Sequence, residues 1–172
     1  EILFNMDASI QKGMRRILEK QGFKFLVDTK VQEIKATKKK GKIKAKSKDG
    51  VIELEADKIL VAVGRKPYTS GLDLEKAGVQ VDQRARVQID EHFKTNVQGI
   101  YAIGDVVRGA MLAHKAEEEG VAAAEIIAQK PGHVNYEAIP SVIYTWPEVA
   151  AVGATEAELK ERSTPYRVGQ FS

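Results

Sequence analysis

The chain has 172 residues, of which 43% are apolar, so its length and composition suit a globular protein with a buried core. It carries 27 basic and 24 acidic side chains, and a net charge of +3 is too modest to indicate a nucleic-acid-binding protein. The absence of cysteine excludes a disulfide scaffold, and no apolar run is long enough to cross a membrane. We therefore expect a soluble intracellular protein that binds neither nucleic acid nor membranes.

The first predicted element is an amphipathic helix over residues 8–21. Its apolar side chains recur at helical spacing on one face, Asp7 is placed to cap its start and Gly22 to end it. Two strands are expected next, over residues 23–27 and 31–37.

A β-hairpin is predicted after these strands. Residues 42–46 and 52–56 alternate polar with apolar around Asp49-Gly50, which is typical of a two-residue turn. Eight lysines and no acid fall between Lys35 and Lys48. Because no aromatic residues interleave with these lysines, we interpret them as the solvated face of an edge sheet rather than a nucleic-acid site.

Two continuous apolar runs, residues 59–64 and 100–103, predict strands that are buried on both faces. The first ends at Gly64, where a ligand could approach the backbone without meeting a side chain. The second stops at Gly104 and presents Asp105 at its carboxyl end, where open α/β sheets bind ligands. A carboxylate there can accept hydrogen bonds from sugar hydroxyls, although a turn or capping role is the alternative for an isolated Gly-Asp.

A second helix is predicted over residues 112–129, with a stripe of small residues that permits close packing, and it ends at Lys130-Pro131-Gly132. Three consecutive acids, Glu117 to Glu119, spread around this helix, so we expect them to be mainly solvated. Thr155-x-x-Glu158 predicts a capping box that opens a short third helix.

Several of these motifs together resemble one family. The pattern T-x-x-x-x-x-Y-A-I-G-D over residues 95–105, followed by M-L-A-H-K-A-E-E-E-G over 111–120, resembles the second flavin-binding segment of the pyridine nucleotide-disulfide oxidoreductases, and within them the dihydrolipoamide dehydrogenase branch. The strand at 59–67 resembles the one that closes the NAD domain, and residues 136–153 resemble the entry to the interface domain.

The resemblance implies an α/β fold with Rossmann-like FAD and NAD domains, a β-meander and the start of an α+β interface domain. It implies that residues 1–66 belong to the NAD domain, 67–138 complete the FAD domain and 139–172 begin the dimer-interface domain. The glycine loop G-x-G-x-x-G is absent, so the chain is expected to be an internal fragment.

The resemblance also implies a set of cofactor-binding residues. The acid matching Asp105 binds the ribitol of FAD, and backbone groups at a helix start approach the flavin. NAD is touched by a strand residue and by the glycine that ends the NAD domain. The implied residues are Asp105, Met111, Leu112, Ala113 and His114 for FAD, and Val31 and Gly64 for NAD. For Val31, a core role is the alternative.

The implied reaction is oxidation of protein-bound dihydrolipoamide to lipoamide through a redox-active disulfide and FAD, with reduction of NAD⁺. Its cysteine pair and acid-base histidine normally lie outside the matching region, so no catalytic residue and no metal site is expected here, and the fragment alone should be inactive. The implied partners are the lipoyl domains of 2-oxo acid dehydrogenase complexes and the glycine cleavage system, with a homodimer as the full protein.

The implied location is the mitochondrial matrix in a eukaryote and the cytoplasm in a bacterium. Two alternatives stay open. One is another disulfide reductase of the family, of the glutathione or mercuric reductase type, running in the opposite direction with NADPH. The other is a non-catalytic binding fragment.

Overall fold

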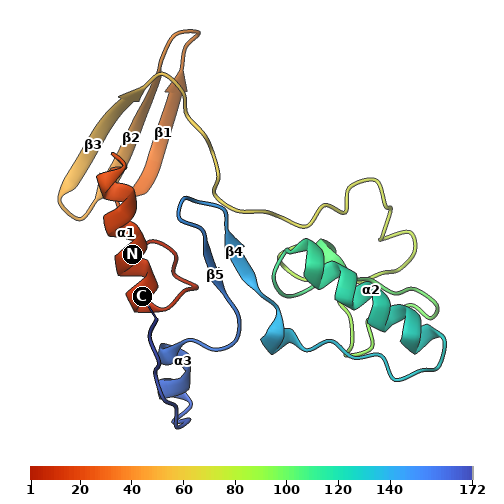
Figure 1. The fold of residues 1–172 in the computed structure, drawn as a ribbon. Coiled ribbons are helices and arrows are strands. Elements are labelled where there is room, and N and C mark those ends of the chain that lie inside the picture. Colours follow the sequence, from red (N-terminus) through yellow and green to blue (C-terminus); the bar gives the residue numbers. More distant parts are fainter. Residues whose placement is uncertain (172) are drawn as a thin grey trace. The chain divides into compact units, whose positions relative to one another are not determined.

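The computed structural model describes residues 1–171, which form two compact units (Figure 1). One unit consists of Glu1–Ala62 and the described residues from Val142 onward, and the other is Val63–Ser141. Each unit has its own buried apolar clusters, so each is described by itself.

The first unit opens with helix α1, Ala8–Lys20, as the sequence predicted. Gly22 follows its last turn with a φ of +97°, and the N–H groups of Gly22 and Phe23 donate back to carbonyls of that turn. Asp7 occupies the N-cap position, but its side chain does not cap α1. Its Oδ1 instead accepts a hydrogen bond of 2.8 Å from the Glu156 N–H, at the start of α3, Glu156–Glu161.

Three antiparallel strands follow as a meander: β1, Lys30–Ala36; β2, Gly41–Ser47; and β3, Gly50–Ala56. The predicted hairpin is confirmed, but its turn lies one residue earlier than expected. Ser47 pairs with Gly50, so Lys48 and Asp49 are the two turn residues. Gly50, with a φ of +125°, begins β3.

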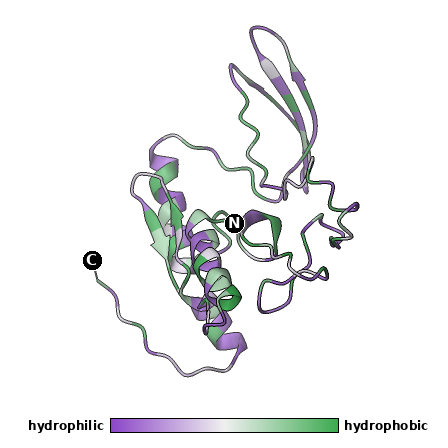
Figure 2. Cartoon of the chain, turned by 90° about the vertical axis from the view of Figure 1, so that its right-hand side faces the viewer, coloured by the Kyte–Doolittle hydropathy of each residue, from purple (hydrophilic) through white to green (hydrophobic). Residues whose placement is uncertain are grey.

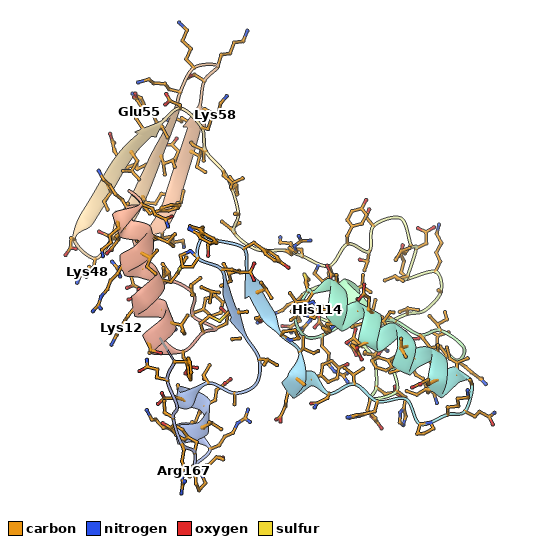
Figure 3. All side chains as sticks on the ribbon, in the orientation of Figure 1. Lys12, Lys48, Glu55, Lys58, His114 and Arg167 are labelled. Atoms are coloured by element: carbon orange, nitrogen blue, oxygen red, sulfur yellow. The ribbon has the colours of Figure 1, made fainter. Side chains whose placement is uncertain are left out.

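The eight lysines from Lys35 to Lys48 are all exposed, which confirms the predicted solvated face. Figure 2 shows this sheet as largely hydrophilic with hydrophobic stretches between. Figure 3 labels Lys48 and Glu55 on this sheet, and Glu55 forms ion pairs with Lys40 and Lys42. These charges therefore balance one another partly within the sheet.

The core of the first unit forms where α1 packs on a short hairpin of β4, Ser141–Ile143, and β5, Val149–Ala151. Its buried members are Met6, Met14, Leu18 and Val149. The predicted capping box of α3 is confirmed: Glu158 accepts from the Thr155 N–H at 2.7 Å, and Thr155 Oγ1 accepts from the Glu158 N–H at 3.3 Å.

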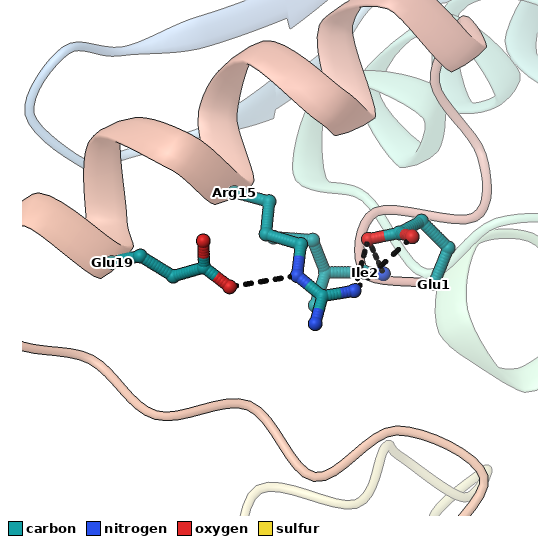
Figure 4. Close-up of polar contacts among 4 residues, drawn as sticks. All are labelled: Glu1, Ile2, Arg15 and Glu19. Atoms are coloured by element: carbon teal, nitrogen blue, oxygen red, sulfur yellow. Dashed lines mark hydrogen bonds and ion pairs between the residues drawn. The ribbon is translucent and has the colours of Figure 1, made fainter.

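Arg15 connects α1 to the start of the chain (Figure 4). Its Nε donates to Glu19 at 2.9 Å and its Nη1 donates to Glu1 at 3.2 Å. The hydrogen bond from Arg15 lowers the pKa of the Glu1 carboxyl below its ordinary value. All three side chains remain open to water, so this cluster is a surface feature.

The second unit is built around helix α2, Ala113–Ile127, which confirms the second predicted helix. A short 3₁₀ helix, η1, Gly104–Val106, packs against it, and another, η2, Tyr136–Ala138, follows it. Ala122 and Ala123 are buried with Phe93 and Val134. Of the predicted stripe of small residues only part packs closely, since Ala113, Ala124 and Ile127 are exposed. A second cluster holds Val79, Val87 and Val107.

Three predicted strands, residues 23–27, 59–64 and 100–103, are wrong. Residues 59–64 pair with no strand within 1–171, and Leu60 and Val63 are 89% and 93% exposed. Within residues 100–103, only Tyr101 forms an isolated β-bridge, and its partner is Lys94. A buried strand needs neighbouring strands to satisfy its backbone. Residues 100–102 find only a short partner in residues 93–95, with hydrogen bonds from the Thr95 N–H to Ile100 and from the Ala102 N–H to Phe93. No helix within residues 1–171 is long and apolar enough to cross a membrane.

Candidate cofactor-binding site

The residue pair that ends the second apolar run, Gly104 and Asp105, forms a tight turn in η1 rather than the end of a strand. Gly104 is buried and has a φ of +74°, and a Cβ placed on it would lie 3.2 Å from the Ala116 Cβ. The Asp105 side chain is exposed, and its carboxylate forms no hydrogen bond or ion pair within residues 1–171. Asp105 is therefore an acceptor open to a ligand.

The predicted flavin-binding residues of the helix start lie on the same unit. Met111 and Leu112 are half-buried, and Leu112 is the N-cap of α2 without a side-chain cap. Ala113 is exposed, and His114 Nε2 lies 2.8 Å from the Pro140 carbonyl oxygen (Figure 3). The first backbone N–H groups of α2 therefore lack a side-chain acceptor, and a helix start of this kind favours negative charge.

A buried ion pair lies directly behind this turn. Lys115 Nζ is 2.8 Å from Glu119 Oε1, and both side chains are 1% exposed. The other carboxylate oxygen, Oε2, accepts the Gly104 N–H at 2.7 Å, while Nζ lies 3.4 Å from the Gly104 carbonyl oxygen. The Tyr136 hydroxyl donates to Oε1 at 2.9 Å. All four groups therefore form one polar network.

Sequence reasoning missed this network. Glu117 and Glu118 are exposed as predicted, but the prediction that Glu119 is solvated is wrong, since it is buried. Consecutive helical residues point in different directions, so one of three acids can face the interior. The available signal was the spacing of Lys115 and Glu119, which places them one turn apart on one face.

The network also affects the Tyr136 phenol. Burial of the hydroxyl and its hydrogen bond to the Glu119 carboxylate raise the pKa of Tyr136 to about 12. The proton of this phenol is therefore held on oxygen at neutral pH, and the hydroxyl acts as a donor to Glu119.

A cavity of about 580 Å³ lies beside Met111. Its lining is rich in basic side chains, and their positive charge favours an anionic ligand. The basic lining residues are Arg65, Lys66, Arg84 and Arg86. Arg86 is also ion-paired with Asp82 at 2.6 Å.

The two predicted NAD residues belong to different units. Val31 lies in β1, 51% exposed, so it does not take the core role that was its alternative. Gly64 has a φ of +114°, and a Cβ placed on it would meet no atom within 4 Å. Backbone there is open to a ligand. Among residues 1–171, no group of histidine, aspartate and glutamate side chains could hold a metal ion.

A family model described as pyridine nucleotide-disulphide oxidoreductase matches residues 1–120, more than half of the chain. The chain belongs to the pyridine nucleotide-disulphide oxidoreductase family. A second model, the dimerisation domain of this family, matches residues 139–172. The resemblance found in the sequence motifs is thereby confirmed.

Members of the family with established names match along most of the chain. Dihydrolipoyl dehydrogenase 1, mitochondrial, of Arabidopsis thaliana is 50% identical over 99% of the chain and 34% of its own length. Dihydrolipoyl dehydrogenase of Trypanosoma brucei brucei is 63% identical over 69% of the chain and 25% of its own length. Leghemoglobin reductase of Glycine max is 50% identical over 99% of the chain and 33% of its own length. The chain spans about a third or less of these relatives.

The fold is also found in a solved member of the disulfide reductases. The HOCl-induced flavoprotein disulfide reductase RclA of Escherichia coli superposes with a TM-score of 0.82 and 24% identity, over 94% of this chain and 37% of that one. Together with the family match, this similarity confirms the predicted α/β flavoprotein fold class, although the individual strands named above are absent from the described residues.

Proposed function

We propose that the protein containing this chain is a dihydrolipoyl dehydrogenase, which oxidises protein-bound dihydrolipoamide to lipoamide and reduces NAD⁺. The observation that carries this proposal is 50% identity to the Arabidopsis enzyme along 99% of the chain. Because the chain spans about a third of that enzyme, the proposed reaction belongs to the whole protein. The redox-active cysteines are proposed to lie in its other parts, since this sequence contains no cysteine. The acid-base histidine is proposed to lie there as well, on the family resemblance alone.

FAD is the proposed cofactor of the second unit. The donor set fits it: the Asp105 carboxylate is free to accept ribitol hydroxyls, and the uncapped start of α2 offers N–H donors to the flavin. In this assignment Met111, Leu112, Ala113 and His114 contact the flavin and its chain, mainly with backbone groups. Bound FAD supplies reversible electron transfer between a dithiol and a nicotinamide.

NAD is proposed to contact Val31 and Gly64, where open backbone and an exposed side chain are compatible with a ligand. We further propose that residues 1–66 belong to the NAD domain, 67–138 to the FAD domain and 139–172 to the interface domain. The dimerisation-domain match over 139–172 supports the last boundary and a homodimer.

The lipoyl domains of 2-oxo acid dehydrogenase complexes and the glycine cleavage system are the proposed partners. Mitochondrial names among the relatives support a location in the mitochondrial matrix, and a bacterial cytoplasm is the counterpart if the source is bacterial. A disulfide reductase of the same family that runs in the opposite direction with NADPH is the competing activity.

The test uses the complete protein and its Asp105→Ala variant. We expect dihydrolipoamide-dependent reduction of NAD⁺, little reaction with NADP⁺, and a bound flavin in the wild type. Loss of the Asp105 carboxylate should weaken FAD binding by about 1–3 kcal/mol, because ribitol hydroxyls lose their acceptor. Faster turnover of a disulfide with NADPH would favour the competing activity. Unchanged FAD affinity in the variant would remove Asp105 from the site.

A further inference from the structure

The buried pair Lys115 and Glu119 needs an explanation beyond helix stability. Two charges withdrawn from water carry a desolvation cost that their mutual attraction often fails to offset. At 1% exposure each, they lie where an apolar pair would normally pack. The explanation lies in the groups that the two side chains bind, which are the backbone N–H and carbonyl of Gly104.

Both polar backbone groups of Gly104 are bound by this pair. Glu119 Oε2 accepts its N–H at 2.7 Å, and Lys115 Nζ lies 3.4 Å from its carbonyl oxygen. That carbonyl belongs to the peptide unit that joins Gly104 to Asp105, so its orientation fixes the peptide plane next to Asp105. The Tyr136 hydroxyl holds Glu119 Oε1 from the other side.

Lys115 is covered by the loop that leads from Asp105 to the start of α2. A Cβ placed on Gly109 would lie 2.9 Å from the Lys115 Cε, and Gly109 has a φ of +98°. The loop therefore passes over the Lys115 side chain at Gly109, where the loop itself has no side chain. The buried pair therefore contacts both the turn before Asp105 and the loop after it.

We infer that Lys115 and Glu119 are positioning residues, which hold the Gly104–Asp105 turn so that the Asp105 carboxylate meets the ribitol hydroxyls of FAD. The inference rests on the proposed function of Asp105. The pair itself need not contact the cofactor. It acts by limiting the backbone conformations of the turn. Less conformational entropy is then lost when the turn binds FAD.

A double-mutant cycle in the complete protein separates this role from a general contribution to stability. FAD dissociation constants are measured by flavin fluorescence for the wild type, Glu119→Gln, Asp105→Ala and the combined variant. If Glu119 acts through Asp105, Glu119→Gln raises the dissociation constant by about tenfold in the wild type and by less than about twofold in the Asp105→Ala background. Glu19→Gln, an exposed helical acid, is the control and should leave it unchanged.

Equal effects of Glu119→Gln in both backgrounds, or none in the wild type, would overturn the inference while leaving Asp105 as a ligand. An unchanged dissociation constant in Asp105→Ala alone would instead contradict the proposed function. If Glu119→Gln does not fold, Tyr136→Phe removes only the outer hydrogen bond of Glu119 and is placed in the same cycle. Its effect should be smaller and should also vanish in the Asp105→Ala background, and additive effects would overturn the inference.

Discussion

Two helices of this protein carry the same local pattern, a base followed four residues later by an acid. In α1 the pair is Arg15 and Glu19, 2.9 Å apart, with side chains 31% and 45% exposed. In α2 it is Lys115 and Glu119, 2.8 Å apart and 1% exposed each. The order base then acid is the less favourable one for a helix, so helix stability alone explains neither pair.

The difference between the pairs lies in their neighbours. Arg15 reaches Glu1 at the chain start and lies over the Phe25 ring, 6.0 Å from its centroid, in contact with water. Lys115 and Glu119 bind both backbone groups of Gly104, whose carbonyl oxygen also accepts the Val107 N–H at 3.2 Å. Identical spacing therefore produces a screened surface contact in one helix and a buried polar anchor in the other.

The largest expected effect is that of Lys115→Met. This change leaves the Glu119 carboxylate buried without its countercharge, which typically destabilises a protein by about 3–5 kcal/mol. Denaturant unfolding of the complete protein measures it. Arg15→Met is the matched control in α1 and should leave the unfolding midpoint nearly unchanged, because water and salt already screen that pair. Equal losses in the two variants would contradict the contrast between the helices.

Gly104→Ala addresses the turn that the buried pair holds. The added Cβ would lie 3.2 Å from Ala116 and force a residue with a φ of +74° to carry a side chain, which we expect to cost about 1–3 kcal/mol. Gly99→Ala is the control, since Gly99 has a φ of +81° and no atom near its Cβ position. The loss of stability should be greater for Gly104→Ala than for Gly99→Ala. Equal losses in the two variants would show that the contact of the added Cβ with α2 does not affect stability.

Thr155→Ala tests whether hydrogen bonds to backbone groups stabilise the fold as much at an exposed site as at a buried one. The capping box of α3 resembles the α2 anchor in binding backbone N–H groups, but Glu158 is exposed. Loss of the Thr155 hydroxyl should cost about 1 kcal/mol, less than Lys115→Met, because water can replace the cap. Thermal unfolding measures this, and a loss as large as that of Lys115→Met would mean that burial is not the decisive difference.

The last expected effect, confined to alkaline pH, is the pH dependence caused by Tyr136. Its pKa is raised from an ordinary value of 10.0 to about 12, so its proton is bound more tightly in the folded state. This contribution to stability is complete below pH 10.0 and is lost as the pH rises through about 12. Unfolding measured across this window should show the loss in the wild type and less of it in Tyr136→Phe. A normal pKa in an ultraviolet titration would contradict the hydrogen bond to Glu119.

The sequence by itself determined the elements whose contacts are local. Helices α1 and α2, the meander of β1 to β3 and the capping box of α3 follow from periodicity, caps and turn residues that lie within a few positions of each other. The motif around Asp105 also indicated the family, which the match over residues 1–120 confirms.

Only the tertiary structure decided the features that depend on distant partners. Apolar runs at 59–64 and 100–103 looked like strands, but hydrophobicity does not supply the neighbouring strands that pair their backbone. Asp7 was expected to cap its own helix and instead binds the start of α3, far along the chain. Glu119 looked solvated, yet it is buried because Gly104 and Lys115 satisfy its charge, and that arrangement exists only once α2 packs on the turn.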